Sequence, residues 1–423
     1  MEAVTMSVED QVTQAALAAR EASRTLGSID AETRANALRD MAQGLRDNTG
    51  AIMEANAKDM AAGKDRGLSA ALLDRLFLDE ERIEKIAVAL EEIAALPDPV
   101  GDVLKEWTID NGLLIQRVSV PIGVIGIIYE SRPNVTADAA GLCIKSGNAC
   151  VLRGGSESIN SNLAIARVLQ DAAEAAGLPK GAVSIVPVTD REGVQVMCRL
   201  PEYIDLIIPR GGEGLIRTVT ENSQVPVLKH YRGMTQIYVD EAADLDLAVK
   251  LVHNAKVQRP GVCNAVENLY VHADASEILN AIVDDLLESG VEVRGCPRTV
   301  ELADAEINAA TDEDFDTEYL DLILSIMIVD SLDDALDKIA EHTSGLTEAI
   351  VTEDQDTADR FLREVDSSAV YHNASTRLTD GGVFGLGAEI GVSTDKIHAR
   401  GPVGAAQLTI FKYVCRGDGQ IRT

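Results

Sequence analysis

Short apolar runs that alternate with helical stretches restrict the fold of this 423-residue chain more than any other feature. In the first half, the candidate strands are residues 124–129, 149–152, 183–186, 204–208 and 225–228. Helical stretches such as residues 162–176 separate them. Because a strand, a helix and a further strand make a parallel pair through a right-handed crossover, this half predicts a doubly wound parallel sheet.

A second series of the same kind predicts a second α/β domain. Its candidate strands are residues 236–239, 269–272, 323–329, 349–352 and 369–371, and helical stretches such as 276–289 separate most of them. Residues 7–97 precede both series and are predicted to be helical, with Ser7 and Asp30 as N-caps. The predicted fold class is therefore α/β, with two doubly wound domains.

Residues 107–118 interrupt this alternation. They centre on Asn111-Gly112 between β-rich flanks, which is the strongest short signal for a hairpin. Residues 407–415 are a further candidate strand, and an exposed strand needs a partner because an unpaired edge invites aggregation. We expect the hairpin and this strand to contribute to a contact between subunits of a homo-oligomer.

Charge and composition exclude several classes of protein. The net charge of −31 repels a phosphate backbone, so no nucleic acid is expected as a partner. No apolar run approaches the ~20 residues of a membrane-spanning helix, and the N-terminus lacks the pattern of a signal peptide, which favours the cytoplasm. The six cysteines form no CxxC pair and the six histidines do not cluster, so neither a metal site nor a disulfide scaffold is expected.

The segment Gln258-Arg259-Pro260-Gly261-Val262-Cys263-Asn264 presents one cysteine after a tight Pro-Gly turn. Arg259 supplies positive charge that favours the thiolate, which is the nucleophilic form of cysteine. A buried structural cysteine after a turn is the alternative interpretation.

Two glycine-rich segments follow candidate strands and lead into helical stretches. They are Arg153-Gly154-Gly155-Ser156 and Arg210-Gly211-Gly212. Glycines let the backbone approach an anion, and a helix N-terminus with a neighbouring arginine attracts it, so both are candidate phosphate contacts. Each can equally be an ordinary turn between a strand and a helix.

Three longer motifs resemble the signatures of the gamma-glutamyl phosphate reductase family, which belongs to the aldehyde dehydrogenase superfamily. They are Tyr129-Glu130-Ser131-Arg132-Pro133-Asn134-Val135-Thr136, the Cys263 segment, and Asn373-Ala374-Ser375-Thr376-Arg377-Leu378-Thr379-Asp380-Gly381-Gly382. The resemblance implies NADPH-dependent reduction of L-glutamate 5-phosphate to glutamate 5-semialdehyde and phosphate, in proline biosynthesis. It also implies an atypical Rossmann NADPH-binding domain (residues 1–105 and 122–229), a catalytic domain (230–403) and an oligomerisation element (106–121 and 404–423).

The resemblance also assigns residue roles. Cys263 is the expected nucleophile that forms a thioester, and Asn134 is the expected side-chain donor to the oxyanion. The segment Lys229-His230-Tyr231-Arg232-Gly233 stands where hydrolytic aldehyde dehydrogenases carry a water-activating glutamate, and it contains no acid. This absence favours phosphate over water as the acyl acceptor. His230 is either a proton donor or a structural or substrate-orienting residue.

The expected cofactor contacts come from both domains. Arg153 and Gly154, Ser156, and the Arg210-Gly211-Gly212 turn belong to the nucleotide site, and Glu318 matches the glutamate that holds the nicotinamide ribose, although a solvated acid is the alternative. A neutral Ser156 beside Arg153 tolerates a 2′-phosphate, which favours NADPH over NADH. The candidates for substrate binding are Arg259, Arg377, Asn373 and His230.

The remaining alternatives concern the acyl acceptor and the partners. An aldehyde dehydrogenase that uses water or coenzyme A is the enzymatic alternative, and a non-catalytic binding protein is the alternative from another class. We expect no fused kinase domain, and the acyl phosphate is then expected to come from a separate glutamate 5-kinase.

The acidic composition predicts that stability depends on salt. With 69 acidic and 38 basic residues, self-repulsion destabilises the compact state unless ions screen it, as in a halophilic cytoplasm. We expect the unfolding midpoint to rise between low and molar salt. Unchanged stability at low salt would instead indicate only a well-solvated acidic surface.

Overall fold

The computed structural model describes residues 6–422, which divide into two compact units. Unit 1 comprises Met1–Lys229, Gly385–Gly391 and Ile397–Thr423, and unit 2 comprises His230–Phe384 and Val392–Lys396. The chain passes from one unit to the other after Lys229, where the sequence placed a domain boundary. The expected catalytic domain ran on to residue 403, whereas Gly385–Gly391 and residues 397–403 pack with unit 1.

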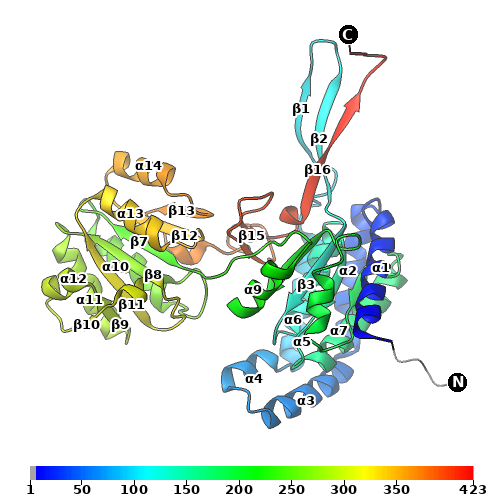
Figure 1. Cartoon of the computed structure of the whole chain (residues 1–423), viewed down its shortest axis with the longest axis horizontal. Helices are drawn as coiled ribbons and strands as arrows, with labels where there is room; N and C mark the ends of the chain where they lie inside the picture. The colour runs from blue at the N-terminus through cyan, green and yellow to red at the C-terminus, as the bar shows by residue number, and fades with distance from the viewer. Residues whose placement is uncertain (1–5, 423) are drawn as a thin grey trace. The chain divides into compact units, whose positions relative to one another are not determined.

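Unit 1 opens with helices, as the sequence predicted for residues 7–97 (Figure 1). They are α1 (Val8–Leu26), α2 (Ala31–Asp47), α3 (Thr49–Asp65), α4 (Ala70–Leu76) and α5 (Glu80–Ala95). The side chains of Ser7 and Asp30 accept hydrogen bonds from the backbone N–H groups of Asp10 and Thr33, so both predicted N-caps are confirmed. Apolar faces of these helices, including Leu38 and Leu90, are fully buried.

A four-stranded parallel sheet forms the centre of unit 1. Its strands are β3 (Val124–Tyr129), β4 (Ala149–Arg153), β5 (Val183–Ile185) and β6 (Leu206–Arg210), in the order β5-β4-β3-β6. The helices between and after them are α6 (Asn134–Lys145), α7 (Ile159–Ala175), α8 (Glu192–Met197) and α9 (Glu213–Asn222). The strand order reverses between β3 and β6, and in open α/β sheets ligands bind outside the carboxyl ends of the strands at such a point.

The predicted strand at residues 225–228 is wrong. This segment makes only an isolated bridge between Val227 and Ile207. Pro226 accepts a hydrogen bond from the Ile207 N–H through its carbonyl, but it has no N–H of its own to continue a ladder. The buried Val225 and Leu228 explain why the segment looked like a strand in the sequence.

A three-stranded antiparallel sheet projects from the rest of unit 1 (Figure 1). It contains β1 (Val103–Thr108), β2 (Leu114–Pro121) and β16 (Thr409–Arg416), with β2 in the middle. The predicted hairpin and the predicted partner for the C-terminal strand are thus confirmed. Gly112 takes φ +85° in the turn, a conformation that favours glycine.

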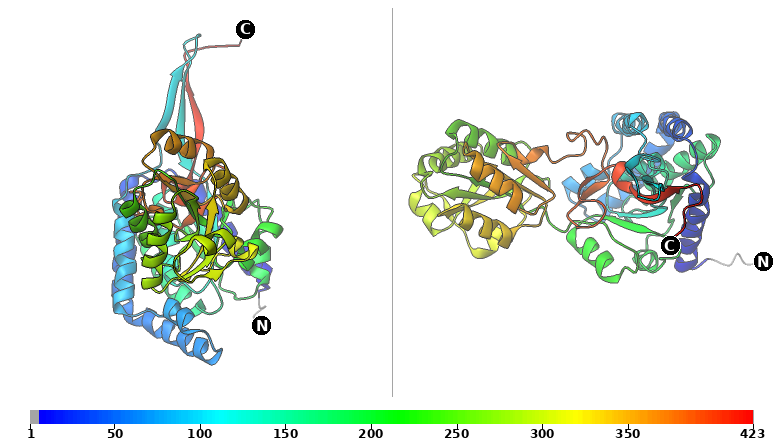
Figure 2. Two further views of the ribbon diagram at one scale, coloured as in Figure 1. Left: turned by 90° about the vertical axis from the view of Figure 1, so that its left-hand side faces the viewer. Right: turned by 90° about the horizontal axis from the view of Figure 1, so that it is seen from above.

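Unit 2 is built on a seven-stranded parallel sheet with helices on both faces (Figure 2). The strands are β7 (Thr235–Val239), β8 (Val266–His272), β9 (Glu292–Gly295), β10 (Asn308–Ala309), β11 (Ile323–Val329), β12 (Thr347–Val351) and β13 (Ala369–His372), in the order β10-β9-β11-β8-β7-β12-β13. The helices are α10 (Leu245–Val257), α11 (Ser276–Glu288), α12 (Pro297–Leu302), α13 (Leu332–His342) and α14 (Gln355–Glu364).

Successive residues of the central strands serve two separate cores. Ile237 and Leu269 pack in the larger cluster with α10 and α11, whereas Tyr238 and Tyr270 pack with α13 and α14 around Phe361. This alternation follows from the two-residue period of a strand. Because helices cover both faces of the sheet, every residue of β7 and β8 is buried.

The remaining described elements are short. They are the strands β14 (Gly391–Ser393) and β15 (Gly401–Val403) and the 3₁₀ helices η1 (Asp312–Asp316), η2 (Thr376–Leu378) and η3 (Ala406–Leu408). Among residues 6–422, no helix is long and apolar enough to cross a membrane.

Candidate functional site

Cys263 lies in the loop that joins α10 to β8, at the amino end of the parallel sheet of unit 2. The side chain is half-buried, and the backbone carbonyl of Cys263 accepts a hydrogen bond from Thr235 Oγ1 at 2.9 Å. A second turn bond joins the Ala265 N–H to the Val262 carbonyl at 3.0 Å. The loop therefore holds the thiol in a defined place that remains partly accessible.

Gly233 packs directly against Cys263. A Cβ atom added to Gly233 would lie 2.5 Å from the Cys263 carbonyl oxygen and 2.6 Å from both its Cα and its Cβ. Real side chains do not approach so closely, so any residue other than glycine would push the cysteine away. The sequence drew attention to this segment only because it lacks an acid. Its glycine proves to be a steric requirement.

Glu318 lies on the other side of Gly233. Its Oε1 accepts a hydrogen bond from the Gly233 N–H at 2.9 Å, so the carboxylate faces the backbone that contacts the thiol. The same short segment passes close to the cysteine turn, because a Cβ on Gly261 would lie 3.6 Å from the Leu320 carbonyl oxygen. Glu318 is therefore tied to the cysteine loop and is not simply a solvated acid.

Two arginines bring positive charge to this loop. The Arg377 Nε donates to Gln258 Oε1 at 3.0 Å, which anchors the motif after β13 to the start of the cysteine segment. Burial lowers the pKa of Arg377 and the charge of Arg259 lowers it further, whereas Asp380 and Cys263 raise it. Arg377 is thus bonded to the segment that carries Arg259 and Cys263. That the two arginines serve an anionic substrate and a thiolate stays a prediction.

Asn264 next to the cysteine has a structural task. Its Nδ2 donates to the Thr379 carbonyl at 2.8 Å, and its own carbonyl accepts from Thr376 Oγ1 at 2.9 Å. These bonds tie the two sequence motifs together, so the side-chain amide of Asn264 points into the motif that follows β13.

The expected role of Asn373 in substrate binding does not fit its place in the structure. Asn373 follows β13 at the carboxyl edge of the sheet, whereas Cys263 lies at the amino edge. Its amide donates to the Thr352 carbonyl and accepts from the Thr352 N–H, and its φ of +52° makes the turn. Asn373 joins the ends of β12 and β13, which is a common use of asparagine in the left-handed region.

His230 opens unit 2 and lies close to residues of β14. Its Nδ1 lies 3.0 Å from the Val392 carbonyl oxygen, so Nδ1 carries a hydrogen and donates it. The second ring nitrogen of the neutral side chain is then an acceptor. A proton donor at that nitrogen would require the protonated imidazolium form.

Asn134 begins α6 in unit 1, and its side chain is oriented by a carboxylate. The Asn134 Nδ2 donates to Asp138 Oδ2 at 2.9 Å, one helical turn away. Burial raises the pKa of Asp138 to about 6, while the hydrogen bond from Asn134 and the charge of Arg210 lower it. Sequence reasoning missed Asp138, because its position four residues after Asn134 indicates a contact only once the segment is known to be a helix.

Arg153 ends β4 and is almost fully buried. Its guanidinium donates to the carbonyl groups of Thr189 and Asp190, and its Nε has no hydrogen-bond partner. Gly154 packs against a side chain here, because a Cβ would lie 2.0 Å from Asn162 Nδ2. A buried guanidinium with an unsatisfied donor fits an anion-binding role at this edge.

Two carboxylates that the sequence analysis did not assign lie at the glycine-rich turns. Glu157 Oε1 accepts from the Ser131 N–H at 2.6 Å beside Gly155, and Glu130 Oε2 accepts from the Gly212 N–H at 2.9 Å. Burial alone would raise the pKa of Glu157, but the hydrogen bonds from Ser131 hold it below its usual value, so it is ionised at neutral pH. Glu130 directly follows β3, and its carboxylate accepts from the N-terminus of α9 after β6, where a phosphate was expected. β3 and β6 are the strands between which the strand order reverses.

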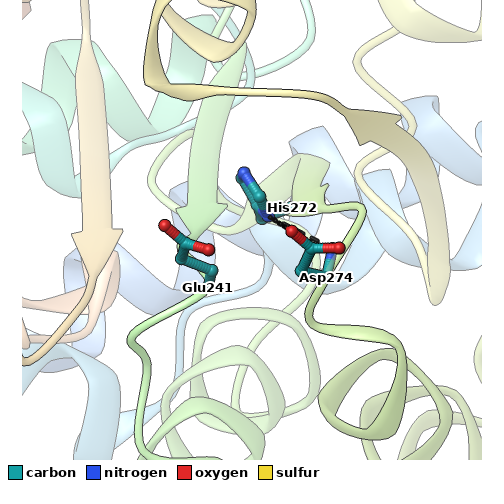
Figure 3. Close-up of side chains that lie close together, drawn as sticks. All are labelled: Glu241, His272 and Asp274. Atoms are coloured by element: carbon teal, nitrogen blue, oxygen red, sulfur yellow. Dashed lines mark hydrogen bonds and ion pairs between the residues drawn. The ribbon is translucent and has the colours of Figure 1, made fainter.

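Glu241, His272 and Asp274 form a cluster at the carboxyl ends of β7 and β8 (Figure 3). The cysteine loop precedes β8 and therefore lies at the opposite edge of the sheet. Their possible ligand atoms lie within 4.8 Å of one another. However, His272 Nδ1 already accepts a hydrogen bond from the Asp274 N–H at 3.2 Å, so the neutral ring carries its proton on Nε2. Neither nitrogen then offers a lone pair to a metal ion as the side chains stand.

Comparisons with known proteins cover essentially the whole chain. The aldehyde dehydrogenase family model matches residues 1–294. A gamma-glutamyl phosphate reductase of Moorella thermoacetica is 55% identical over 419 residues, which cover 99% of this chain and 100% of that protein. The crystal structure of gamma-glutamyl phosphate reductase from Thermotoga maritima is 46% identical, with a TM-score of 0.96 over 98% of this chain and 100% of that one.

A more distant structure shares the fold alone. The acetylating aldehyde dehydrogenase of Geobacillus thermoglucosidasius is 18% identical, with a TM-score of 0.68 over the full length of both chains. The architecture is therefore common to enzymes with different acyl acceptors, and the chemistry must be argued from the residues around Cys263.

The contact of Gly233 with Cys263 predicts that Gly233→Ala displaces the thiol. Because the new Cβ would collide with the cysteine backbone, we expect Cys263 alkylation at neutral pH, followed by peptide mass spectrometry, to change at least severalfold. Gly261→Ala is the matched control, since its Cβ meets only the Leu320 oxygen at 3.6 Å. Equal alkylation rates in the two variants would contradict the steric interpretation.

Proposed function

Because this chain belongs to the gamma-glutamyl phosphate reductase family of aldehyde dehydrogenases, we propose that it reduces L-glutamate 5-phosphate to L-glutamate 5-semialdehyde and phosphate, using NADPH, in proline biosynthesis. The observation that carries this proposal is the acid-free Gly233 segment packed against a cysteine that is flanked by two arginines. An enzyme that must protect a thioester from water needs this combination.

Cys263 is the proposed nucleophile. Its thiolate attacks the acyl carbon of the substrate, the carbon–oxygen bond to phosphate breaks, and phosphate leaves as the thioester forms. Arg259 and Arg377 stabilise the thiolate and attract the anionic groups of the substrate. The developing oxyanion requires preorganised donors, for which we propose the Cys263 N–H and the side-chain amide of Asn134.

NADPH, when bound, supplies the hydride that reduces the thioester to a thiohemiacetal, which then collapses to the aldehyde and frees the thiol. The residues proposed to hold it are Arg153, Gly154, Ser156, the turn of Arg210, Gly211 and Gly212, and Glu318. The unsatisfied Nε of the buried Arg153 supports an anionic ligand at the end of β4. The carboxylates of Glu130 and Glu157 must be accommodated beside that ligand, since both already occupy backbone donors there.

We propose that water competes poorly for the thioester because Gly233, which packs against Cys263, has no side chain that could act as a base. The Oε1 of Glu318 accepts from the Gly233 N–H, which orients that carboxylate toward the backbone. Phosphate or arsenate should therefore be required in the oxidative direction, which distinguishes this function from hydrolytic and coenzyme A-dependent relatives.

The three-stranded sheet of unit 1 is the proposed oligomer contact, and the kinase that makes the acyl phosphate is the proposed metabolic partner. The edge strands β1 and β16 expose apolar side chains, with Val103 at 52% and Tyr413 at 58% exposure. Trp107 and Tyr413 pack edge to face at 6.1 Å between their ring centroids. A second copy of this chain would cover this apolar surface, which a monomer leaves in water.

Cys263→Ala tests the mechanism. We expect it to reduce phosphate-dependent oxidation of glutamate 5-semialdehyde with NADP by roughly a thousandfold or more, because it removes the thiol that is proposed to form the thioester. The fold should be retained, as circular dichroism and the urea midpoint can show. Cys296→Ala, at the other partly buried thiol, is the control and should keep full activity. Undiminished turnover in Cys263→Ala would refute the mechanism.

Glu157→Gln tests the assignment of the cofactor site. Removing a negative charge next to Arg153 should lower the KM for NADPH by about threefold, as expected for one partly exposed like charge, with a smaller effect on NADH. Glu174→Gln makes the same charge change at an exposed position of α7 and should alter neither value. A KM that falls equally for both cofactors would show that Glu157 does not face the 2′-phosphate.

A further inference from the structure

A fully buried ion pair joins the two ends of the cysteine loop. Lys256 near the end of α10 and Glu267 in β8 have side chains with 0% exposure, and Lys256 Nζ lies 2.8 Å from Glu267 Oε2. Lys256 also donates to the Val266 carbonyl at 2.9 Å. Because burial of two charges costs about as much as their attraction returns, such a pair is poor evidence for a role in stability alone.

The second oxygen of Glu267 holds a strained backbone. Glu267 Oε1 accepts from the Leu320 N–H at 3.1 Å. Leu320 has φ +54°, in the left-handed region that non-glycine residues rarely adopt, although its side chain is 45% exposed. Residues in this region persist where surrounding contacts determine them, and they cluster at functional sites. One contact that does this is the hydrogen bond to the buried carboxylate of Glu267, and the hydroxyl of the neighbouring Tyr319 is held by Asp314 and Ser325.

The strained segment reaches Cys263 from two sides. Glu318, two residues before Leu320, accepts from the N–H of Gly233, which packs against the cysteine backbone. The Leu320 carbonyl lies against Gly261 in the turn before the thiol. Residues 318–320 therefore connect the ion pair to Gly233 and Gly261, the two glycines close to Cys263, and we call this segment the brace.

We infer that Lys256 and Glu267 are positioning residues: Lys256 fixes the Glu267 carboxylate, and Glu267 holds the Leu320 N–H so that Glu318 faces Gly233 beside Cys263. The part of this inference that concerns the cofactor rests on the proposed function, which assigns Glu318 to the nicotinamide ribose. The part that concerns the brace rests only on the contacts within unit 2.

Two double variants separate positioning from simple stability. The acceptor-retaining variant, Lys256→Met/Glu267→Gln, removes both charges but keeps an oxygen that can accept from the Leu320 N–H. The acceptor-free variant, Lys256→Met/Glu267→Leu, removes both charges and the acceptor. Both replace the pair as a whole, which avoids the uncompensated buried charge that a single substitution leaves. Their urea midpoints show whether the two variants are equally stable.

The expected result is a difference between the two variants. The acceptor-free variant should raise the KM for NADPH at least tenfold with a smaller change in kcat, whereas the acceptor-retaining variant should stay within about threefold of the parent in both constants. Adding Leu320→Gly to the acceptor-free variant should return the KM most of the way to the parental value, because glycine adopts φ +54° without a holding contact. If the pair served stability alone, the apparent kcat of both variants would fall in proportion to the folded fraction, their KM would be unchanged, and Leu320→Gly would have no effect on it.

Hydrogen exchange gives a readout that does not depend on the activity. We expect the amide hydrogens of Gly233 and Leu320 to exchange faster in the acceptor-free variant than in the parent, and at the parental rate in the acceptor-retaining variant. If the parent shows this protection but no NADPH-dependent turnover, the proposed function fails and the brace stands. A parental exchange rate together with a parental KM in the acceptor-free variant would overturn the inference. If the acceptor-free variant does not fold, a tenfold higher KM in the folded acceptor-retaining variant would overturn it as well.

Discussion

The close approach of Gly233 to Cys263 is the constraint on which the rest of the site depends. A glycine without a Cβ lets the backbone before β7 contact the backbone before β8, and its N–H then reaches the Glu318 carboxylate. Any other residue would separate these segments, and Glu318 would lose its donor. The same glycine places no side chain against the backbone of Cys263. The protection from water that we propose for the thioester rests on the same residue.

Most of the fold could be predicted from the sequence because its signals are local and repeated. The N-caps at Ser7 and Asp30, the Asn111-Gly112 hairpin and the run at residues 323–329 all appear where the pattern placed them. The errors have physical causes. Pro226 prevents residues 225–228 from continuing a ladder despite their burial, and β10 is too short to give a periodic signal.

The candidate site was less predictable because its contacts join segments far apart in the chain. The motifs identified Cys263, Arg259 and Arg377, but they could not show that the Asn264 amide turns toward Thr379. They also could not place Asn373 at the opposite edge of the sheet from the thiol. The carboxylates of Glu130 and Glu157 were hidden for the same reason, since nothing local in the sequence indicates which backbone donors they satisfy.

The turns proposed for the cofactor lie at the carboxyl edge of the sheet of unit 1, whereas Cys263 lies at the amino edge of the sheet of unit 2. The turns proposed for the cofactor follow strands and precede helices, so the N-terminus of α9 contributes positive potential there. Cys263 instead follows the C-terminal end of α10, where the helix dipole is negative and disfavours a thiolate. We propose that the charges of Arg259 and Arg377 offset that potential. Arg259 belongs to the same loop as the proposed nucleophile, whereas Arg377 comes from a distant part of the chain and is fixed there by its bond to Gln258.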